Sequence, residues 1–417
     1  MAKDFLSSVL CIANRSEGFR KQLMQRVMKV RLLIITVLIS FNAFAQDDYS
    51  LSPVEFSGYV KDVQTVFVPY GMEENWLSDN AIHNRLKLKY YYKDWLTFDI
   101  QARNRFIYGD FVKFFPDYAK YAQSSNYFLD MDYVWLNDSS AVGLSELDRL
   151  YFQLTKGDWE VTVGRQRINW GMNLVWNPND IFNTFSYFDF EYEERPGTDA
   201  IRVKYYTSIT GSAELVYKAG EEVDEMAFAG LYRFNAGSYD FQFLGGFMGK
   251  DLVLGTGYSG SIKGAAFRGE LTYFKPRQIY DYTINKDGVV VSSVSADYTF
   301  SNTLYLHAGI LYNSSGASGK AGQIQLLSNQ ELSPKMLSRG KFNLFAQTSF
   351  SITPLITANL SSIINPDDLS AFISPSITAS LSDNFSTSLF GQFFMGSADT
   401  EYGHIGQIAY LRFKYSF

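Results

Sequence analysis

The feature that most constrains this chain is a two-residue alternation of side-chain polarity that persists from Val54 to the last residue. In the final segment, 404–417, the odd-numbered side chains are almost all apolar, whereas the even-numbered ones include Arg412 and Lys414. The same division recurs in three further segments, 82–92, 95–108 and 342–352. Such alternation predicts strands with one face toward lipid and the other toward water.

Eighteen strands are predicted, each bounded by turn residues. Their ranges are 54–67, 80–92, 95–108, 146–155, 158–167, 198–208, 211–219, 226–234, 237–248, 252–259, 262–274, 290–300, 303–313, 340–352, 355–364, 370–381, 384–396 and 404–417. Every second connection is a tight turn, such as Lys93-Asp94 or Lys156-Gly157. The intervening connections are often long, and the longest are 109–145, 168–197, 275–289 and 314–339.

Short turns at one end and long loops at the other are typical of transmembrane barrels. A sheet inside hydrocarbon cannot leave a backbone edge unpaired, so the first and last strands must meet. The predicted fold class is therefore all-β: a transmembrane antiparallel β-barrel of about 16–18 strands, with 18 the best count. A secreted sandwich or propeller is the alternative, but it would have to bury many outward Phe, Tyr and Leu side chains.

The composition supports the barrel. Aromatic residues make up 17% of the chain, with 35 Phe and 29 Tyr, as aromatic girdles at both membrane interfaces would require. Mean hydropathy is −0.12, which disfavours a bundle of membrane helices. The single cysteine, Cys11, excludes a disulfide scaffold.

The N-terminal region carries an export signal. A basic start at Met28, an apolar run and the small-residue pattern Ala43-Phe44-Ala45 predict a signal peptide over 28–45, exported by the Sec pathway. Residues 1–27 are then an over-extended start, 46–53 a short periplasmic N-terminus and 54–417 the barrel. Without residues 1–45 the net charge is −11, which disfavours binding to nucleic acid.

The terminal strand 410–417 resembles the C-terminal signal of Gram-negative outer-membrane barrels, with Phe413, Tyr415 and the final Phe417. The resemblance implies insertion by the barrel-assembly machinery, and contact with outer-membrane lipid and lipopolysaccharide. The cleavage context around Ala45 is similar to that of exported proteins of Bacteroidetes.

A second resemblance begins with Gly164-Arg165-Gln166 and continues through Trp170-Gly171, Asn177-Pro178 and Asp180. This arrangement is similar to porin-like outer-membrane proteins and, distantly, to barrels of the alginate-export type. It covers roughly 40 residues and implies porin-like membership, with no substrate.

Enzymatic chemistry has little support. The chain has three histidines, and neither a metal-ligand spacing nor a Gly-rich phosphate loop is evident. His307 shares a predicted inward face with Tyr305, and His404 lies in a loop, so a polar lining or loop role is the simpler interpretation of each. No cofactor or catalytic residue is predicted.

Basic side chains gather on the face predicted to line the lumen. The candidate lining residues are Arg85, Lys87, Lys89, Gln101, Arg103, Arg105, Arg202, Lys204 and His307. Neighbouring strands place same-face side chains about 5 Å apart, so the cations repel one another unless anions lie between them. They either form a basic wall that attracts anionic solutes, or they pair with carboxylates such as Asp99 and Glu214 in a structural network.

The 168–197 connection is rich in aromatic and acidic side chains, and long loops are commonly functional. It is predicted to fold into the barrel as a constriction, with interfacial packing as the alternative; its candidate residues are Trp170, Trp176, Asp180, Tyr187, Asp189 and Glu191. Arg165 and Arg167 pose a conflict, because their parity with Val163 places them on the lipid-facing side. A bulge, the membrane boundary or a wrong strand assignment would resolve it.

The sequence thus predicts a passive, porin-like channel in the outer membrane for small hydrophilic solutes, either anionic or sugar-like. A closed-lumen barrel for envelope assembly or polysaccharide export is the alternative, and an outer-membrane hydrolase is a third. The residues leave open whether the barrel is a monomer or a homo-oligomer.

Overall fold

The computed structural model of the chain describes residues 52–72, 76–115, 117–123, 127–189, 193–277, 287–324 and 333–417. Residues Pro53–Phe417 form one compact unit. The expected over-extended start, the signal peptide and most of the expected periplasmic N-terminus lie outside the described residues. Within the described ranges, no helix is long and apolar enough to cross a membrane.

Strands make up most of the described chain. They are β1 (Val54–Pro69), β2 (Leu77–Tyr92), β3 (Leu96–Gly109), β4 (Asp132–Asp138), β5 (Ala141–Lys156), β6 (Trp159–Gln166), β7 (Thr198–Tyr206), β8 (Ser212–Lys218), β9 (Ala227–Ala236), β10 (Tyr239–Met248), β11 (Asp251–Ile262), β12 (Ala265–Pro276), β13 (Val289–Thr299), β14 (Tyr305–Asn313), β15 (Phe342–Thr353), β16 (Ile356–Asn365), β17 (Ser370–Ser382), β18 (Phe385–Met395) and β19 (Gly406–Ser416). The described helices are α2 (Asp110–Phe114), α3 (Tyr118–Ala122) and the 3-10 turn η2 (Val223–Glu225).

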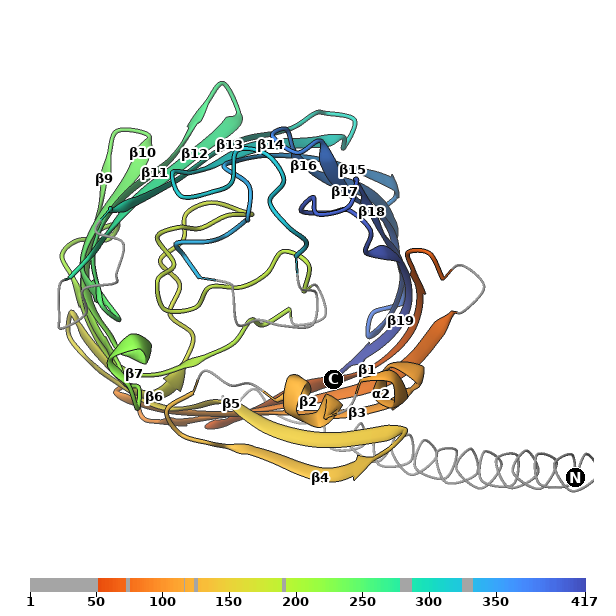
Figure 1. Ribbon diagram of the computed structural model, residues 1–417. Helices are drawn as coiled ribbons and strands as arrows, with labels where there is room; N and C mark the ends of the chain where they lie inside the picture. Colours follow the sequence, from red (N-terminus) through yellow and green to blue (C-terminus); the bar gives the residue numbers. More distant parts are fainter. Residues whose placement is uncertain are drawn as a thin grey trace, which may run out of the picture. The chain divides into compact units, whose positions relative to one another are not determined.

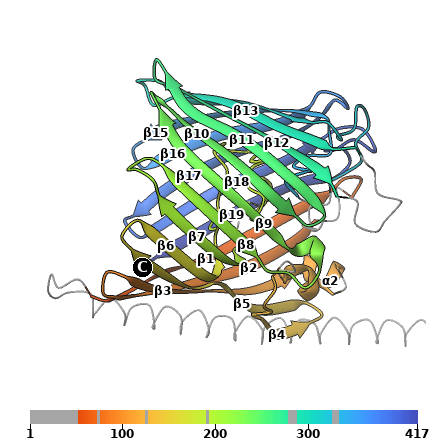
Figure 2. The same ribbon diagram turned by 90° about the vertical axis from the view of Figure 1, so that its left-hand side faces the viewer.

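All strands except β4 pair in one closed antiparallel ring of 18 strands (Figures 1 and 2). β1 pairs with β2 along one edge and with β19 along the other, which closes the ring. At the seam, the backbone N–H of Gly58 donates to the carbonyl of Phe417 at 2.8 Å. The predicted barrel and its count of 18 strands are confirmed, because each predicted segment coincides with one strand of the ring. Closure leaves no unpaired edge around the wall.

β4 is the strand that the sequence did not predict. It lies outside the ring and pairs with the first part of β5, beyond the point where the short β6 ends (Figure 1). Gly143 of β5 makes room for it, because a Cβ there would lie 2.4 Å from the Trp135 ring. The predicted loop 109–145 was therefore wrong in part. Asp and Asn at both ends of β4 hide its strand character, since these residues are rare in strands.

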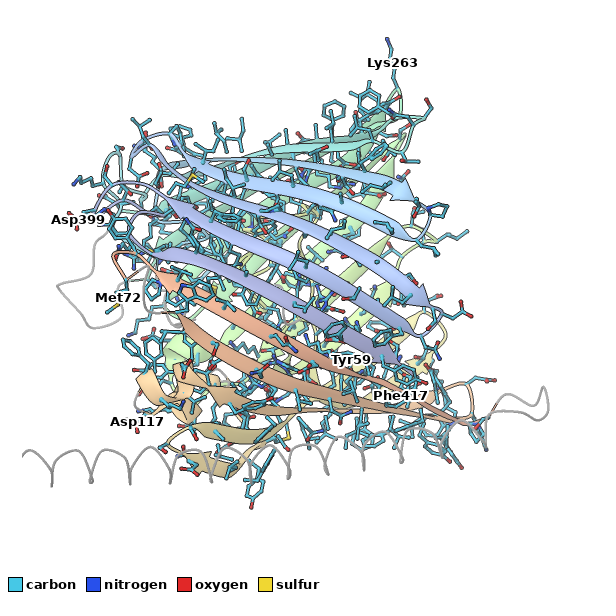
Figure 3. All side chains as sticks on the ribbon, turned by 90° about the vertical axis from the view of Figure 1, so that its right-hand side faces the viewer. Tyr59, Met72, Asp117, Lys263, Asp399 and Phe417 are labelled. Carbon is cyan, nitrogen blue, oxygen red and sulfur yellow. The ribbon has the colours of Figure 1, made fainter. Side chains whose placement is uncertain are left out.

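The connections alternate as predicted. One end of the barrel has short turns, in which Gly157 and Gly237 adopt positive φ of 58° and 66°. The other end carries the long loops. Figure 3 shows Met72, Asp117 and Asp399 toward the loop end, whereas Lys263 and Phe417 lie toward the turn end.

The wall has an apolar outside and a polar inside. Outward side chains such as Leu88, Phe152 and Leu389 are 37%, 54% and 52% exposed. Inward side chains such as Asp99 and Gln242 are fully buried. Exposed aromatic side chains gather at the turn end of the wall, namely Tyr90, Tyr92, Trp95, Trp159 and Tyr205. An apolar belt flanked by aromatic side chains is what a lipid-facing barrel surface requires.

Candidate functional site in the barrel interior

The connection between β6 and β7, residues 167–197, folds into the ring; it is the yellow-green segment inside the barrel in Figure 1. One carboxylate on the wall holds its first part. Glu270 of β12 accepts hydrogen bonds from the backbone N–H groups of Asn173 and Asn179, at 2.9 and 3.0 Å, and from that of Met172. Because Glu270 is 3% exposed, these bonds satisfy a charge that burial would otherwise make costly.

Two tryptophans of this loop are fixed by polar contacts. The Trp170 indole N–H donates to Glu214 of β8 at 3.2 Å, and the Trp170 carbonyl accepts from Gln242 of β10 at 2.8 Å. The Trp176 carbonyl accepts from Ser293 of β13 at 2.8 Å. Both rings are buried, so the aromatic content of the loop forms a core inside the barrel.

The next part of the loop packs against the opposite side of the wall. The Tyr187 ring lies 5.3 Å from that of Phe345 on β15, and the Phe188 ring lies 4.9 Å from that of Phe372 on β17. The Phe188 carbonyl accepts from Gln392 of β18 at 3.3 Å. Edge-to-face aromatic contacts of this kind add stability beyond the area that they bury.

The last part of the loop returns to the seam of the barrel through two carboxylates. Glu193 lies 2.8 Å from Arg412 and 2.6 Å from Lys414 on β19. Glu194 accepts from the Tyr59 hydroxyl at 3.0 Å and lies 3.3 Å from Lys87. Burial acts to raise the pKa of both loop carboxyls, but their basic partners outweigh it and lower each pKa below 4.5. Loop 167–197 thus contacts strands around most of the ring.

The predicted lining cations all lie close to carboxylates. Arg85 is 2.8 Å from Asp148, and Arg105 is 3.5 Å from Glu146. The remaining pairs are Lys87–Glu194 at 3.3 Å, Lys89–Asp99 at 3.8 Å, Arg103–Glu146 at 4.0 Å, Arg202–Glu160 at 2.6 Å and Lys204–Glu214 at 3.5 Å. Gln101 accepts from Arg85 at 2.8 Å. This arrangement matches the paired network rather than an unshielded basic wall.

One cavity in this wall, called the arginine cavity, has three arginines among its lining residues. It has a volume of about 120 Å³ and is lined by Gln101, Arg149, Tyr151, Gln153, Thr162, Gln166, Arg167 and Arg202. Three arginines thus line the cavity and no carboxylate does, although Arg149 lies 3.6 Å from Asp148 and Arg202 lies 2.6 Å from Glu160. Within the described part of the chain, Thr162 Oγ1 and the Nε atoms of Arg167 and Arg202 have no hydrogen-bond partner. Unused donors and hydroxyls around a small cavity suit the oxygens of a small anion.

The wall on the other side of the lumen is uncharged. From β14 to β18 no strand contains Asp, Glu, Lys or Arg. Buried Asn313, Asn343, Ser361 and Gln392 line its inner face instead. His307 lies on the same wall, 3% exposed, with its ring 5.0 Å from that of Phe345. The lumen therefore has one charged side and one uncharged side, where amides and hydroxyls alternate with inward apolar residues such as Phe345 and Phe372.

The other predicted residues lie in varied places. Asp180 is buried in the loop and accepts from the Trp170 backbone N–H at 3.3 Å; burial raises its pKa to about 7. The backbone N–H of Asp189 donates to Ser186 within the loop. Glu191 lies outside the described residues. His404 is a loop residue whose ring stacks on Tyr70 at 3.9 Å. Phe413 and Tyr415 lie in the outward row of β19.

Arg165 resolves the conflict noted in the sequence. It does lie in the outward row of β6, beside Asp199 of β7 at 2.8 Å, but it is 1% exposed. The Tyr127 ring covers it, with the guanidinium carbon 3.6 Å from the ring centre. The strand assignment was therefore right, and a covering segment before β4 shields the charge. Arg167 follows the end of β6 and lines the arginine cavity.

Several functional residues of the interior were not among those predicted from the sequence. Glu146, Asp148 and Glu160 supply most of the counter-charges, and Arg149 completes the cavity. The inward direction of Glu160 could have been read from the sequence, because this residue alternates with Val161 and Val163. The direction of Asp148 was hidden, because the register of β5 against β3 shifts at this residue.

The similarity of this chain to known proteins lies in its fold. No family model matches the sequence, and no curated protein matches it. Among solved structures, OccAB3 of Acinetobacter baumannii has a TM-score of 0.57 at 10% identity, covering 88% of this chain and 100% of its own. OccAB4 of the same organism has a TM-score of 0.56 at 9% identity, covering 89% and 100%.

The outer membrane protein OpdK of Pseudomonas aeruginosa is similar as well. It has a TM-score of 0.54 at 8% identity, covering 87% of this chain and 98% of its own. At these identities the likeness concerns the fold alone. The chain thus has the fold of a closed antiparallel barrel of 18 strands that is shared with an outer membrane protein.

Proposed function

We propose that this protein is a passive, porin-like channel in the outer membrane for small hydrophilic solutes, with a preference for solutes that carry an anionic group. The observation that carries the proposal is the two-sided wall: an apolar belt outside, polar side chains inside, and loop 167–197 across the lumen. A ring of this strand number is wide enough for an aqueous lumen. Pore width and lining charge then select solutes, without an enzyme reaction or a cofactor.

The arginine cavity supports the anionic preference. Arg149, Arg167 and Arg202 line it without a lining carboxylate, although Arg149 and Arg202 lie close to Asp148 and Glu160. The Nε atoms of Arg167 and Arg202, which have no hydrogen-bond partner in the described part of the chain, are the groups that would meet an anionic solute. The amides and hydroxyls of the opposite wall suit the uncharged part of the same solute. Trp170, Trp176, Asp180, Tyr187, Asp189 and Glu191 belong to the proposed constriction.

Export and assembly complete the proposal. The segment 28–45 would direct Sec-dependent export, and the terminal strand with Phe413, Tyr415 and Phe417 would be recognised by the barrel-assembly machinery. The outward belt would then contact outer-membrane lipid and lipopolysaccharide. The likeness to an outer membrane protein supports this location.

Single-channel recording in planar bilayers tests the proposal. The mature protein is expected to give discrete open steps, because the proposal places an aqueous path through the ring beside the loop. Arg149→Gln, Arg167→Gln and Arg202→Gln together should shift the reversal potential toward cation selectivity. Arg277→Gln is the matched control, since Arg277 stacks on the outward Phe247 ring and does not line the cavity.

Two results would count against the proposal. A silent bilayer with folded, heat-modifiable protein would favour a closed-lumen barrel for assembly or export. Open steps with no change in selectivity in the triple variant would remove the anionic preference and leave the passive channel.

A further inference from the structure

Polar side chains gather on the outward face of β1, β2, β3 and β5. The pairs Asn84↔Asn104 and Asn104↔Ser145 cross β2, β3 and β5 in the outward row. The Asn104 amide donates to Asn84 Oδ1 at 3.1 Å, and the Ser145 hydroxyl donates to Asn104 Oδ1 at 2.7 Å. Asp62 and Gln64 continue the patch onto β1, 3.5 Å apart. These five residues, 62, 64, 84, 104 and 145, are called the outer polar patch.

The direction of these side chains follows from their neighbours. Asn84 shares its row with Leu86 and Leu88, which are 36% and 37% exposed on the outside. The inward row of the same strand contains Arg85, which is fully buried. The outer polar patch therefore lies on the side that the lipid belt occupies elsewhere.

No comparable patch occurs on the opposite wall. From β13 to β18 the outward row contains only apolar side chains, Gly, Pro, Ser and Thr, and no charged or amide side chain. The outer polar patch also lies near mid-height, because Asp62 is the ninth of 16 residues of β1 and Asn84 the eighth of 16 of β2. At that depth lipid is the poorest solvent for polar groups.

Two other charges of the outward row are covered, whereas Lys275 at the loop end of β12 is exposed. Arg165 and Asp199 lie in the outward row near the loop end, and the segment around Tyr127 and Leu129 leaves them 1% and 6% exposed. The outer polar patch has no such cover over all of its residues. Gln64 is exposed, and Asp62, Asn84 and Asn104 are half-buried. Polar groups that reach the surface of a lipid-facing wall call for a protein neighbour.

The chemistry of the patch is self-complementary. Gln64, Asn84 and Asn104 each donate one amide N–H within the protein, to Asp62, to the Tyr59 carbonyl and to Asn84. Each amide carries a second N–H that can donate to a neighbour, and the Asp62 carboxylate and the amide carbonyls have lone pairs that can accept. In a two-fold contact between identical surfaces, each donor can meet the partner's acceptor at the same height. The small outward residue Ala102 lies beside the patch on β3 and permits close approach of the two walls.

We propose that the outer polar patch on β1, β2, β3 and β5 is the contact surface for a second copy of this chain, related by a two-fold axis along the barrel. The inference rests on the proposed membrane location and does not depend on solute passage. β4 flanks the contact at the loop end, where Tyr133 and Trp135 are 68% and 46% exposed.

Cysteine cross-linking in membranes tests the contact. Asn84→Cys should give a covalent product of twice the monomer mass with a short bismaleimide, because the two copies of this position lie near the axis. Leu360→Cys is the matched control and should stay monomeric. Leu360 lies in the outward row of β16, far from the outer polar patch in the strand order, and is 46% exposed. The one native cysteine, Cys11, precedes the expected cleavage site. Gln64→Cys provides a second position if the first variant does not fold.

The outcomes separate the occupants of the patch. A monomer from both positions in heat-modifiable protein would overturn the proposal, and a product that contains a different polypeptide would overturn the choice of a second copy. Asn84→Leu with Asn104→Leu gives an independent result. It should dissociate the dimer if the patch is an interface, and it should raise the stability of a monomer if the patch faces lipid. The cross-linking result does not depend on whether the barrel conducts. A failure of the channel proposal can therefore be told apart from a failure of the dimer proposal.

Discussion

At the scale of single residues, the interior is governed by paired charges. Glu193 and Glu194 fix the return of loop 167–197 to the seam through Arg412, Lys414 and Lys87. Partly exposed pairs of this kind contribute on the order of 1 kcal/mol each, since water screens them. Several weak contacts thus fix one loop end, which leaves it sensitive to conditions that remove the negative charges.

The lowered pKa values of Glu193 and Glu194 set the direction of a pH effect. Their stabilisation is fully present above the ordinary value of 4.5 and is lost as pH falls through the lower values of the folded state. We expect the channel conductance to change between pH 7 and pH 3 as the loop end leaves the wall. The double variant Glu193→Gln, Glu194→Gln should show the acid-state conductance already at pH 7. Equal traces at both pH values in the native protein would contradict this account.

Which charges line the lumen was readable from the sequence, and two of the named partners, Asp99 and Glu214, do lie beside Lys89 and Lys204. The partners Glu146, Asp148 and Glu160 were not predicted. Period-two alternation placed Arg85 and Arg103 inward, and the structure puts both there. The inward direction of Asp148 was not predicted, because a shift of register interrupts the alternation in β5. Counter-charges depend on which strands become neighbours and in which register, and a single strand does not contain that information.

At the scale of elements, loop 167–197 behaves as part of the core. Its tryptophans and its backbone are fixed to the wall, with Glu270 as the common acceptor for three N–H groups. The sequence left two interpretations of this aromatic loop open, entry into the barrel and interfacial packing, because so many rings are unfavourable in water. The structure has the loop inside the barrel (Figure 1). The sequence could not predict the anchor, since Glu270 is about 90 residues away on a strand with ordinary alternation.

Removing the anchor should release the first part of the loop. Glu270→Ala leaves the N–H groups of Met172 and Asn179 without this acceptor, while the Asn173 N–H keeps its bond to Asn177 Oδ1 at 2.9 Å. Each buried unsatisfied group costs about 1–3 kcal/mol. We expect faster cleavage of the loop in limited proteolysis and a noisier open state in single-channel traces. Glu55→Ala is the control, because Glu55 is an exposed carboxylate that accepts from Tyr91 at the turn end. Identical cleavage rates for the two variants would show that Glu270 does not hold the loop.

At the scale of the whole molecule, closure and alternation account for most of the architecture. Backbone groups have no partner in hydrocarbon, so the ring must close, and β1 with β19 closes it. This reasoning predicted all 18 strands of the ring from the sequence. It missed β4 because that strand lies outside the ring and is not subject to the same constraint.

The central claim is that alternate residues of one strand face lipid and water. Site-directed spin labels along β16, placed one at a time from Thr357 to Ser362 in lipid vesicles, test it most directly. Oxygen should reach labels at Ala358, Leu360 and Ser362 preferentially, and a water-soluble nickel complex should reach those at Thr357, Asn359 and Ser361. Equal access of the nickel complex to both rows would contradict the account.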